Sequence, residues 1–112
     1  RRKSSRLKVQ VVVDHILGDD ENCLCVSEDL SAGGIQITGA EGHGWGRPRH
    51  AWLQFRLPND QRSPVRALGE LRYERDGENG QTVRGYRFKY MSPRERWAFN
   101  RFIQETNHEL IA

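Results

Sequence analysis

Apolar and polar residues alternate in a series of short runs, and this pattern constrains the fold more than any other feature of the chain. A period of two places successive side chains on opposite faces of a half-buried β-strand. Clusters of glycine, proline, asparagine and aspartate separate the runs, where tight turns are expected. The runs cover residues 7–17, 22–27, 35–38, 51–57, 65–73 and 83–90. Short strands joined by turns predict a small β-barrel.

Two glycines disturb the alternation in the last two runs. Gly69 stands among the alternating residues of the fifth run, and the apolar parity of the sixth run changes at Gly85. A β-bulge adds one residue to one strand of a pair and so shifts the parity of the residues that follow. The sequence therefore predicts bulges at Gly69 and Gly85.

The last part of the chain has the signals of a helix. Ser92 is a good N-terminal cap, Pro93 suits the first helical position, and Glu95 completes a capping box. The apolar residues that follow at helical spacing share one face: Phe99, Phe102, Ile103 and Leu110. A single amphipathic helix must bury this face against the sheet. We therefore expect an all-β domain with one C-terminal amphipathic helix.

Length and composition are those of a single globular domain. The 112 residues are 36% hydrophobic and 29% charged, which suffices for one modest core, so we expect residues 1–112 to form one domain. Because the chain begins with Arg1 rather than methionine, we expect it to be part of a longer protein. No apolar run approaches the roughly 18 residues of a membrane-spanning helix, so we expect the domain not to span a membrane.

Charge and cysteine content narrow the class of ligand. A net charge of +3 suits a small anionic ligand better than a long nucleic acid, which usually needs a broad basic face. Cys23 and Cys25 lie two residues apart, on the same face of a strand, and are too few for a structural zinc site. We expect free thiols, buried or half-buried, in a reducing cytoplasm, and no metal.

The sequence does not resemble an enzyme. No Ser/His/Asp spacing or pair of catalytic acids stands out. The histidines are scattered over unrelated segments, and we expect each of them at the surface: His15, His43, His50 and His108.

Two polar stretches carry the functional signal. The first is an Arg-x-x-x-Arg element, Arg2 and Arg6, directly before the first apolar run. The second is Asp-x-Ser-x-x-Gly, formed by Asp29, Ser31 and Gly34 between two runs. Each element alone is weak, but both together, in this order and each followed by a strand, resemble the signature of the PilZ domain. That family is a bacterial receptor module for cyclic di-GMP.

The resemblance covers nearly the whole chain. The segment 53–58 is similar to the family's middle strand, and 85–88 with the following helix is similar to its last strand and C-terminal helix. The resemblance implies a six-stranded antiparallel β-barrel with a helix packed at one end. It also implies a regulatory role, with cyclic di-GMP and a fused or partner effector domain as partners. Such domains act in exopolysaccharide synthesis, biofilm formation and motility, in the cytoplasm or as the cytoplasmic part of a membrane-associated protein.

The implied roles of the arginines follow from the chemistry of the dinucleotide. A guanidinium can stack on guanine and can donate hydrogen bonds to its O6 and N7 atoms or to a phosphate. The resemblance gives these roles to Arg2 and Arg6, and we add Arg1 as a phosphate contact. Because the segment around them is basic and contains no apolar residue before Leu7, we expect it to become ordered when the ligand binds.

The second stretch complements the arginines. The Asp29 carboxylate can accept hydrogen bonds from the N1–H and N2–H₂ edge of guanine, and Ser31 supplies a short hydroxyl group. Gly33 and Gly34 are expected to take positive φ in the turn, and Gly34 is expected to let the backbone approach the ligand closely. The site predicted from the sequence is therefore Arg1, Arg2, Arg6, Asp29, Ser31, Gly33 and Gly34.

Two other readings remain open. One is a PilZ-like scaffold that binds no nucleotide and contacts a protein through its helix or through the glycine-rich loop 39–48. The other is a small nucleic-acid-binding barrel with Trp45, Trp52 and Tyr73 as stacking platforms. The pattern favours these aromatics as core residues instead. Within the loop, Trp45 or Arg47 could close over a ligand, but the density of glycines favours a flexible connector.

Overall fold

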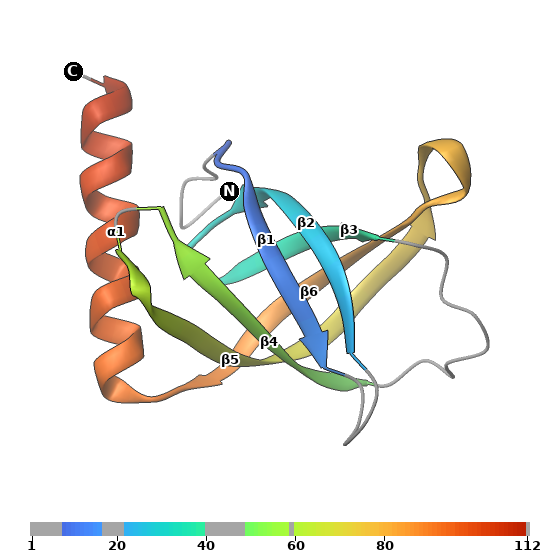
Figure 1. Cartoon of the computed structure of the whole chain (residues 1–112), viewed down its shortest axis with the longest axis horizontal. Helices are drawn as coiled ribbons and strands as arrows, with labels where there is room; N and C mark the ends of the chain where they lie inside the picture. Colours follow the sequence, from blue (N-terminus) through green and yellow to red (C-terminus); the bar gives the residue numbers. More distant parts are fainter. Residues whose placement is uncertain (1–7, 17–21, 40–48, 59, 112) are drawn as a thin grey trace.

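The computed structural model describes residues 8–16, 22–39, 49–58 and 60–111. Within them the strands form a closed antiparallel barrel in the order β1-β2-β3-β6-β5-β4, and helix α1 stands along one side of it (Figure 1). This confirms the predicted fold class. The elements are β1 (Val11–Ile16), β2 (Asn22–Leu30), β3 (Gly34–Gly39), β4 (His50–Leu57), β5 (Asp60–Asp76), a short 3-10 turn (Glu78–Gly80), β6 (Thr82–Met91) and α1 (Pro93–Ile111).

Strand boundaries differ from the prediction where hydrogen-bonded pairing continues into polar sequence. β2 runs on to Leu30, because Asp29 and Leu30 still pair with Gln36 and Ile35 of β3. Asp29 therefore lies in a strand and not in a turn. β5 is 17 residues long, well beyond the predicted run 65–73. β1 is shorter than predicted and begins at Val11.

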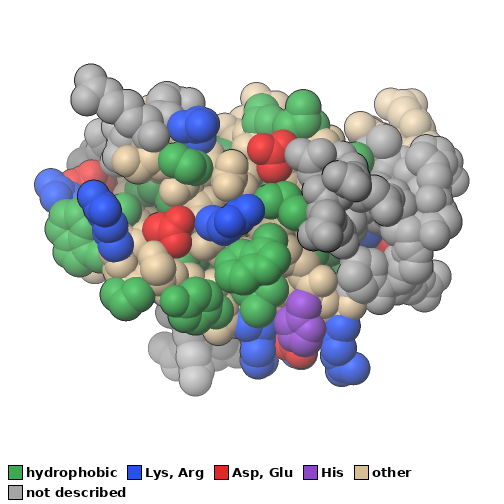
Figure 2. All heavy atoms as spheres, turned by 60° about the horizontal axis from the view of Figure 1, so that its bottom comes forward, with side chains coloured by type: hydrophobic (Ala, Val, Ile, Leu, Met, Phe, Trp, Pro, Cys, Tyr) green, Lys and Arg blue, Asp and Glu red, His purple; other side chains and the backbone are tan. Residues whose placement is uncertain are grey.

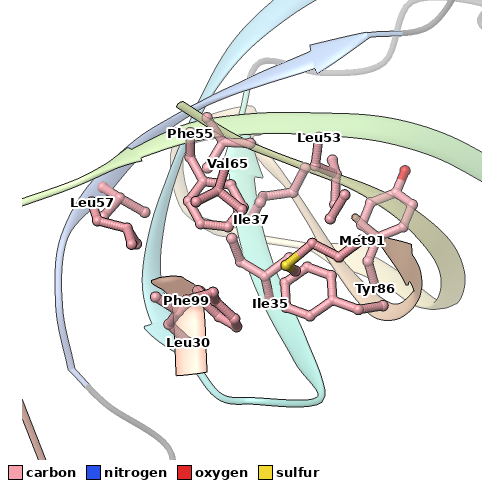
Figure 3. Close-up of a cluster of buried hydrophobic side chains, with 14 of the residues drawn as sticks. Leu30, Ile35, Ile37, Leu53, Phe55, Leu57, Val65, Tyr86, Met91 and Phe99 are labelled. Atoms are coloured by element: carbon pink, nitrogen blue, oxygen red, sulfur yellow. The ribbon is translucent and has the colours of Figure 1, made fainter. Parts of the chain in front are cut away.

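The inward side chains of the barrel and the apolar face of α1 form one core (Figure 3). Phe99 of α1 is fully buried, and its ring lies 5.8 Å from that of Phe55 and 5.5 Å from that of Phe88, both edge to face. Phe102 and Ile103 are also buried, as the helical spacing predicts. The helix thus closes the core, and each aromatic pair adds about 0.5–1.5 kcal/mol beyond its buried area.

The pairing of the described strands shifts register at four places, one between β4 and β5 and three in the pairs β2–β3 and β5–β6. Glu28 of β2, Arg72 of β5 and Lys89 of β6 are each skipped in the pairing of their strand with its neighbour. The predicted bulge at Gly69 is therefore close to a real one, but the extra residue is Lys89 on the opposite strand. The predicted bulge at Gly85 is wrong in the same way, because the extra residue opposite it is Arg72.

A buried arginine explains the misleading parity around Gly85. Arg84 pairs with the inward residue Ile37 and is only 5% exposed, so it points into the barrel. Its guanidinium forms an ion pair with Glu74, at 2.8 Å between Nε and Oε2. β6 therefore alternates regularly through Arg84 and Tyr86, and a polar residue occupies a position where the pattern expects an apolar one.

The predictions for the cysteines are confirmed, whereas one of those for the histidines is wrong. Cys25 is buried, Cys23 is half-buried and both are free, as predicted. His50 is exposed, but His15 is fully buried, which contradicts its predicted surface position. The side chains of His43 and His108 lie outside the described residues.

The helix start is confirmed. The Glu95 N–H donates to Ser92 Oγ at 3.3 Å, and the Ser92 hydroxyl donates to Glu95 Oε1 at 2.8 Å. Among the described residues, no helix is both long enough and apolar enough to cross a membrane.

Candidate ligand-binding site

The second polar stretch of the sequence forms one side of a pocket of about 230 Å³. All of its predicted site residues line that pocket: Asp29, Ser31, Gly33 and Gly34. Strands β3, β5 and β6 complete the lining with residues that the sequence analysis did not select: Ile35, Gln36, Arg72, Tyr73, Gly85, Tyr86 and Arg87. The structure thus brings the second predicted element together at a cavity and adds an opposite wall to it.

The turn between β2 and β3 is a tight hairpin. The Ser31 N–H donates to the Gly34 carbonyl at 3.0 Å, and the Gly34 N–H donates back to the Ser31 carbonyl at 3.4 Å. The Ser31 hydroxyl also donates to the Gly34 carbonyl, at 3.4 Å. Within the described residues positive φ occurs only at Asn79 and Gly80, so the predicted positive φ of Gly33 and Gly34 is wrong.

Gly34 is required by the barrel itself. A Cβ atom at this position would overlap the carbonyl oxygen of Tyr86 on the neighbouring strand. No heavy atom lies within 4 Å of the corresponding position at Gly33. The close approach that the sequence suggested at Gly34 is therefore an approach to β6.

The bulge at Glu28 aims Asp29 into the pocket. Ser27 points into the barrel and is fully buried, and strict alternation would send Asp29 inward as well. The extra residue reverses the parity, so that Leu30 enters the core and Asp29 faces outward. Ser27 Oγ accepts a hydrogen bond from the Asp29 N–H at 3.3 Å, which stabilises the irregular backbone.

A row of paired residues forms the floor and sides of the pocket. Asp29 of β2 pairs with Gln36 of β3, Gln36 pairs with Gly85 of β6, and Gly85 pairs with Tyr73 of β5. The Tyr73 hydroxyl donates to Gln36 Oε1 at 2.6 Å, passing over the glycine. The pocket therefore extends across four neighbouring strands, and the Tyr73 ring lies over the backbone of Gly85.

The electrostatic character of the site is mixed. On one side, the Asp29 carboxylate is 11% exposed, and Lys8 Nζ lies 4.0 Å from its Oδ2 atom. On the other side, Arg87 Nη2 and Arg72 Nη1 lie 3.3 Å and 3.6 Å from Oε1 of Glu70.

Glu70 is the centre of a wider cationic group. Arg49 Nε also lies 4.0 Å from its Oε2 atom. Desolvation raises the pKa of Glu70, but Lys89, Arg87 and Arg72 outweigh it and hold the pKa below its ordinary value. The carboxylate stays ionised and the cations around it outnumber it, so this wall of the pocket is positive.

Helix α1 contacts the hairpin turn between β2 and β3 through a hydrogen bond. Arg96 Nη1 donates a hydrogen bond to the carbonyl oxygen of Ala32 at 3.0 Å. Ala32 is the residue between Ser31 and Gly33, at the tip of the turn. One charged side chain of the helix therefore fixes the backbone that carries the signature residues.

The remaining predicted contacts cannot be placed. Arg1, Arg2 and Arg6 lie outside the described residues, as do Trp45 and Arg47 of the glycine-rich loop. Their proposed roles stay predictions from the sequence.

The expectation that the aromatics are core residues is wrong for Trp52 and Tyr73. Trp52 is 38% exposed and Tyr73 is 41% exposed, both on the outside of the barrel. On the face drawn in Figure 2, the described Lys and Arg side chains stand singly or in small groups between apolar ones. This arrangement differs from the broad basic stripe that is typical of proteins that bind long nucleic acids.

Three signals could have identified the opposite wall from the sequence. Gln36 is a polar residue between two core isoleucines, and Arg87 stands in the same way between Tyr86 and Phe88. The disturbed parity at Gly85 marks the place where the neighbouring strand is irregular. What the sequence does not reveal is which strand carries the extra residue.

Comparison with known proteins places this geometry in a family. The family model of the PilZ domain matches residues 1–105, and no curated protein matches the chain. The inhibitor of motility of Bacillus subtilis, MotI/DgrA, has a similar structure, with a TM-score of 0.78 and 18% identity over 99% of this chain. The chain spans 52% of that protein, about half of its length.

The PilZ domain of YcgR from Escherichia coli, solved with c-di-GMP, is similar over almost its whole length. Its TM-score is 0.71 at 20% identity, and the match covers 98% of this chain and 94% of that one. At these identities the two structures establish the shared fold. Because the family match extends over nearly the entire sequence, the chain belongs to the PilZ domain family.

Proposed function

We propose that this domain is a receptor for cyclic di-GMP that regulates a fused or partner effector in the cytoplasm. The observation that carries the proposal is the convergence of Asp29, Ser31, Gly33 and Gly34 on one pocket. PilZ domains are binding and regulatory modules, and the related domain of YcgR was solved with this dinucleotide.

The pocket chemistry suits guanine. Asp29 presents an outward carboxylate, which can accept from the N1–H and N2–H₂ donors of the base. Ser31 lies beside it and adds a hydroxyl group. Guanine also carries the acceptors O6 and N7 on its Hoogsteen edge, and these are the atoms that arginine recognises best. Arg2 and Arg6 are therefore the proposed partners for that edge, and Arg1 for a phosphate.

The volume of the pocket indicates which part of the ligand it can hold. Protein pockets for drug-sized ligands usually enclose about 300–1,000 Å³. A pocket of about 230 Å³ is smaller and suits one nucleobase rather than a whole dinucleotide. The rest of the ligand then needs further contacts, which the segment 1–6 supplies by becoming ordered over it. This ordering would reposition whatever is attached before Arg1.

Calorimetric titration of the domain with cyclic di-GMP and with cyclic di-AMP tests the proposal. Adenine lacks the 2-amino donor and carries an acceptor at N1, so the Asp29 carboxylate would face a lone pair. A site built for hydrogen bonds rejects the analogue that lacks them by about 10⁴-fold or more, and we expect at least 100-fold here because the pocket is open on one side. Asp29→Ala should weaken cyclic di-GMP binding and reduce this discrimination.

Two results would contradict the proposal. Equal affinity for both dinucleotides would remove the role of Asp29. The absence of any binding to cyclic di-GMP would favour the alternative of a scaffold that acts through protein contacts alone.

A further inference from the structure

The outer face of the barrel carries a row of apolar side chains where water-facing residues are expected. Ile16 of β1 pairs with Trp52 of β4, Trp52 pairs with Leu68 of β5, and Leu68 pairs with Tyr90 of β6. We propose that this apolar row is a docking site for an amphipathic helix of a partner protein whose flanks are acidic. The row shares no residue with the ligand pocket, so the inference goes beyond the proposed function.

The residues around the apolar row show that this side of the barrel is otherwise polar. On β4 and the facing part of β5 the outward residues are His50, Trp52, Gln54, Arg56, Arg66, Leu68 and Glu70. Trp52 and Leu68 are the two apolar members of this set, one on each strand, and the register places them opposite each other. Single apolar residues are ordinary on a protein surface, but a contiguous group of them is typical of interaction sites.

A bulge extends the apolar row onto β6. Strict alternation after the inward Phe88 would turn Tyr90 into the core. Because Lys89 is the extra residue, Phe88 pairs with Gly69 while Tyr90 pairs with Leu68. Lys89 and Tyr90 are consequently both exposed, Tyr90 by 54%. The irregular pairing therefore adds an aromatic ring and a cation to the outer face at the same place.

The spacing of the apolar row suits a helix. Neighbouring strands lie about 4.8 Å apart, close to the 5.4 Å pitch of an α-helix. A helix laid across the strands therefore places one apolar residue per turn over successive members of the row, which is how amphipathic helices are commonly recognised. Figure 2, which brings β4 and β5 at the lower edge of Figure 1 forward, shows apolar side chains between single cations on this side.

The cations beside the apolar row are available to a partner. The Arg66 guanidinium lies 5.7 Å from the centroid of the Trp52 ring, and Lys89 adjoins Tyr90. Within the part of the chain that the structure describes, neither Arg66 nor Lys89 forms an ion pair with a carboxylate. The β5–β6 end of the row therefore offers positive charge on both sides of an apolar strip.

The acidic groups near that end are already engaged. Oε1 of Glu70 lies 3.3 Å from Arg87 Nη2 and 3.6 Å from Arg72 Nη1. Oε2 of Glu95 accepts a hydrogen bond from the backbone N–H of Arg66 at 2.9 Å, and Oε1 accepts one from the Ser92 hydroxyl. A partner with acidic side chains beside its apolar face complements the remaining charge, whereas a basic one is repelled.

A second copy of the domain and a lipid bilayer fit this surface less well. The barrel is convex, so two barrels would meet over a narrow strip, whereas a stable interface buries about 800 Å² on each partner. A bilayer takes up side chains that protrude from the surface, but Ile16 and Leu68 are half-buried between polar neighbours. A narrow helix reaches such a strip, because its own side chains supply the protruding groups.

The test titrates the domain into a fluorescently labelled synthetic helix and measures polarisation. The probe has about four turns, with leucines along one face and glutamates on both flanks, and a matched peptide carries lysines instead. The glutamate peptide should bind about 10-fold or more tightly than the lysine peptide. Trp52→Thr should weaken its binding about 10-fold or more, as loss of an aromatic anchor does. Trp97→Gln, at a 63% exposed position on α1 outside the row, should bind within about 2-fold of wild type.

Charge reversal gives a second arm that leaves the apolar row intact. Lys89→Glu should weaken binding of the glutamate peptide about 3- to 10-fold and strengthen binding of the lysine peptide. Arg75→Glu is the matched control, because it makes the same change in net charge at an exposed position of β5 outside the row. Both substitutions are on the surface, so these variants are expected to fold.

The outcomes identify the occupant and separate this inference from the proposed function. Failure of the glutamate peptide to bind, or equal binding by wild type and Trp52→Thr, would overturn it. A dimer in sedimentation that Trp52→Thr dissociates would assign the row to a second copy, and binding to phosphatidylglycerol vesicles that this variant loses would assign it to a membrane; both overturn the helix. Asp29→Ala should bind the peptide like wild type. A domain that binds the peptide but not cyclic di-GMP would keep this inference and lose the proposed function.

Discussion

At the scale of single residues, two adjacent glycines of the hairpin turn have different reasons to be glycine. The space around Gly33 is open, whereas β6 lies directly against Gly34. Gly34 pairs with Arg87, and the carbonyl of Tyr86 occupies the place of a side chain. A residue of the signature stretch is thus needed for strand pairing before any ligand is considered.

This difference predicts opposite results for two minimal substitutions. Gly34→Ala should lower the free energy of unfolding by about 1–3 kcal/mol, because the backbone of β3 or β6 must shift to admit the methyl group. Gly33→Ala should change it by less than about 0.5 kcal/mol. Urea denaturation of both variants measures this. A Gly34→Ala variant as stable as wild type would show that the strands adjust freely.

His15 is the second residue whose role is structural. It is fully buried, and its Nε2 atom lies 2.7 Å from the hydroxyl of Tyr86. Burial, together with the nearby Arg84 guanidinium, lowers the pKa of His15 from 6.5 to about 4. Burial raises the pKa of Tyr86 to about 12, so its hydroxyl stays protonated. The folded barrel therefore holds a neutral imidazole next to a buried arginine.

Acid should destabilise the barrel through this histidine. Below pH 6.5 the unfolded chain takes up a proton on His15, but the folded chain does so only near pH 4. The free energy of unfolding should therefore fall by about 3 kcal/mol across this window and change little further below it. His15→Gln removes the titrating group and should abolish this part of the pH dependence. His50→Gln, at an exposed position, should retain it, and identical pH profiles for wild type and His15→Gln would contradict the assignment.

At the scale of elements, the sequence predicted what pattern alone determines. The strands, their turns, the start of α1 and its buried face follow from apolar periodicity and capping residues, and the resemblance supplied the closed barrel. The pattern failed where a polar side chain takes an inward position, as Arg84 and His15 do. It also could not locate the extra residues at Glu28 and Arg72, because a bulge depends on both strands of a pair.

These two bulges explain why only one side of the pocket could be predicted from the sequence. Asp29 was identified by its motif, although its outward direction depends on the bulge at Glu28. Tyr73 has the parity of a core residue and faces outward only because of the bulge at Arg72. No local propensity marks either event, since it is the pairing with the neighbouring strand that skips one residue.

The contact between helix and turn gives a prediction at the same scale. Arg96→Ala removes the hydrogen bond to the Ala32 carbonyl and should loosen the hairpin turn. We expect a loss of about 1 kcal/mol in the free energy of unfolding and a roughly 5-fold weaker binding of cyclic di-GMP. Arg101→Ala is the control, because its ion pair with Glu105 lies within the helix. Unchanged affinity in Arg96→Ala would show that the turn keeps its shape without the helix.

At the scale of the whole molecule, the proposed ligand site combines two kinds of contact. The pocket of β2, β3, β5 and β6 is built on paired strands, and α1 braces its turn. A site on such elements is set before the ligand arrives. The proposed arginine contacts come from the sequence before the barrel, which has no apolar residue until Leu7. Binding should therefore change the two parts of the chain to different degrees.

Amide hydrogen exchange with and without cyclic di-GMP measures this difference. Protection should rise strongly over residues 2–7, because the segment exchanges contacts with water for contacts with the ligand. It should change little over residues 99–110 of α1, whose Phe99, Phe102 and Ile103 are buried in the core. In Arg6→Ala the rise over residues 2–7 should be smaller, while the pocket residues on β3 and β6 stay unaffected. Strong protection of residues 2–7 before the ligand is added would show that the arginines are already docked, and that binding cannot reposition an effector through them.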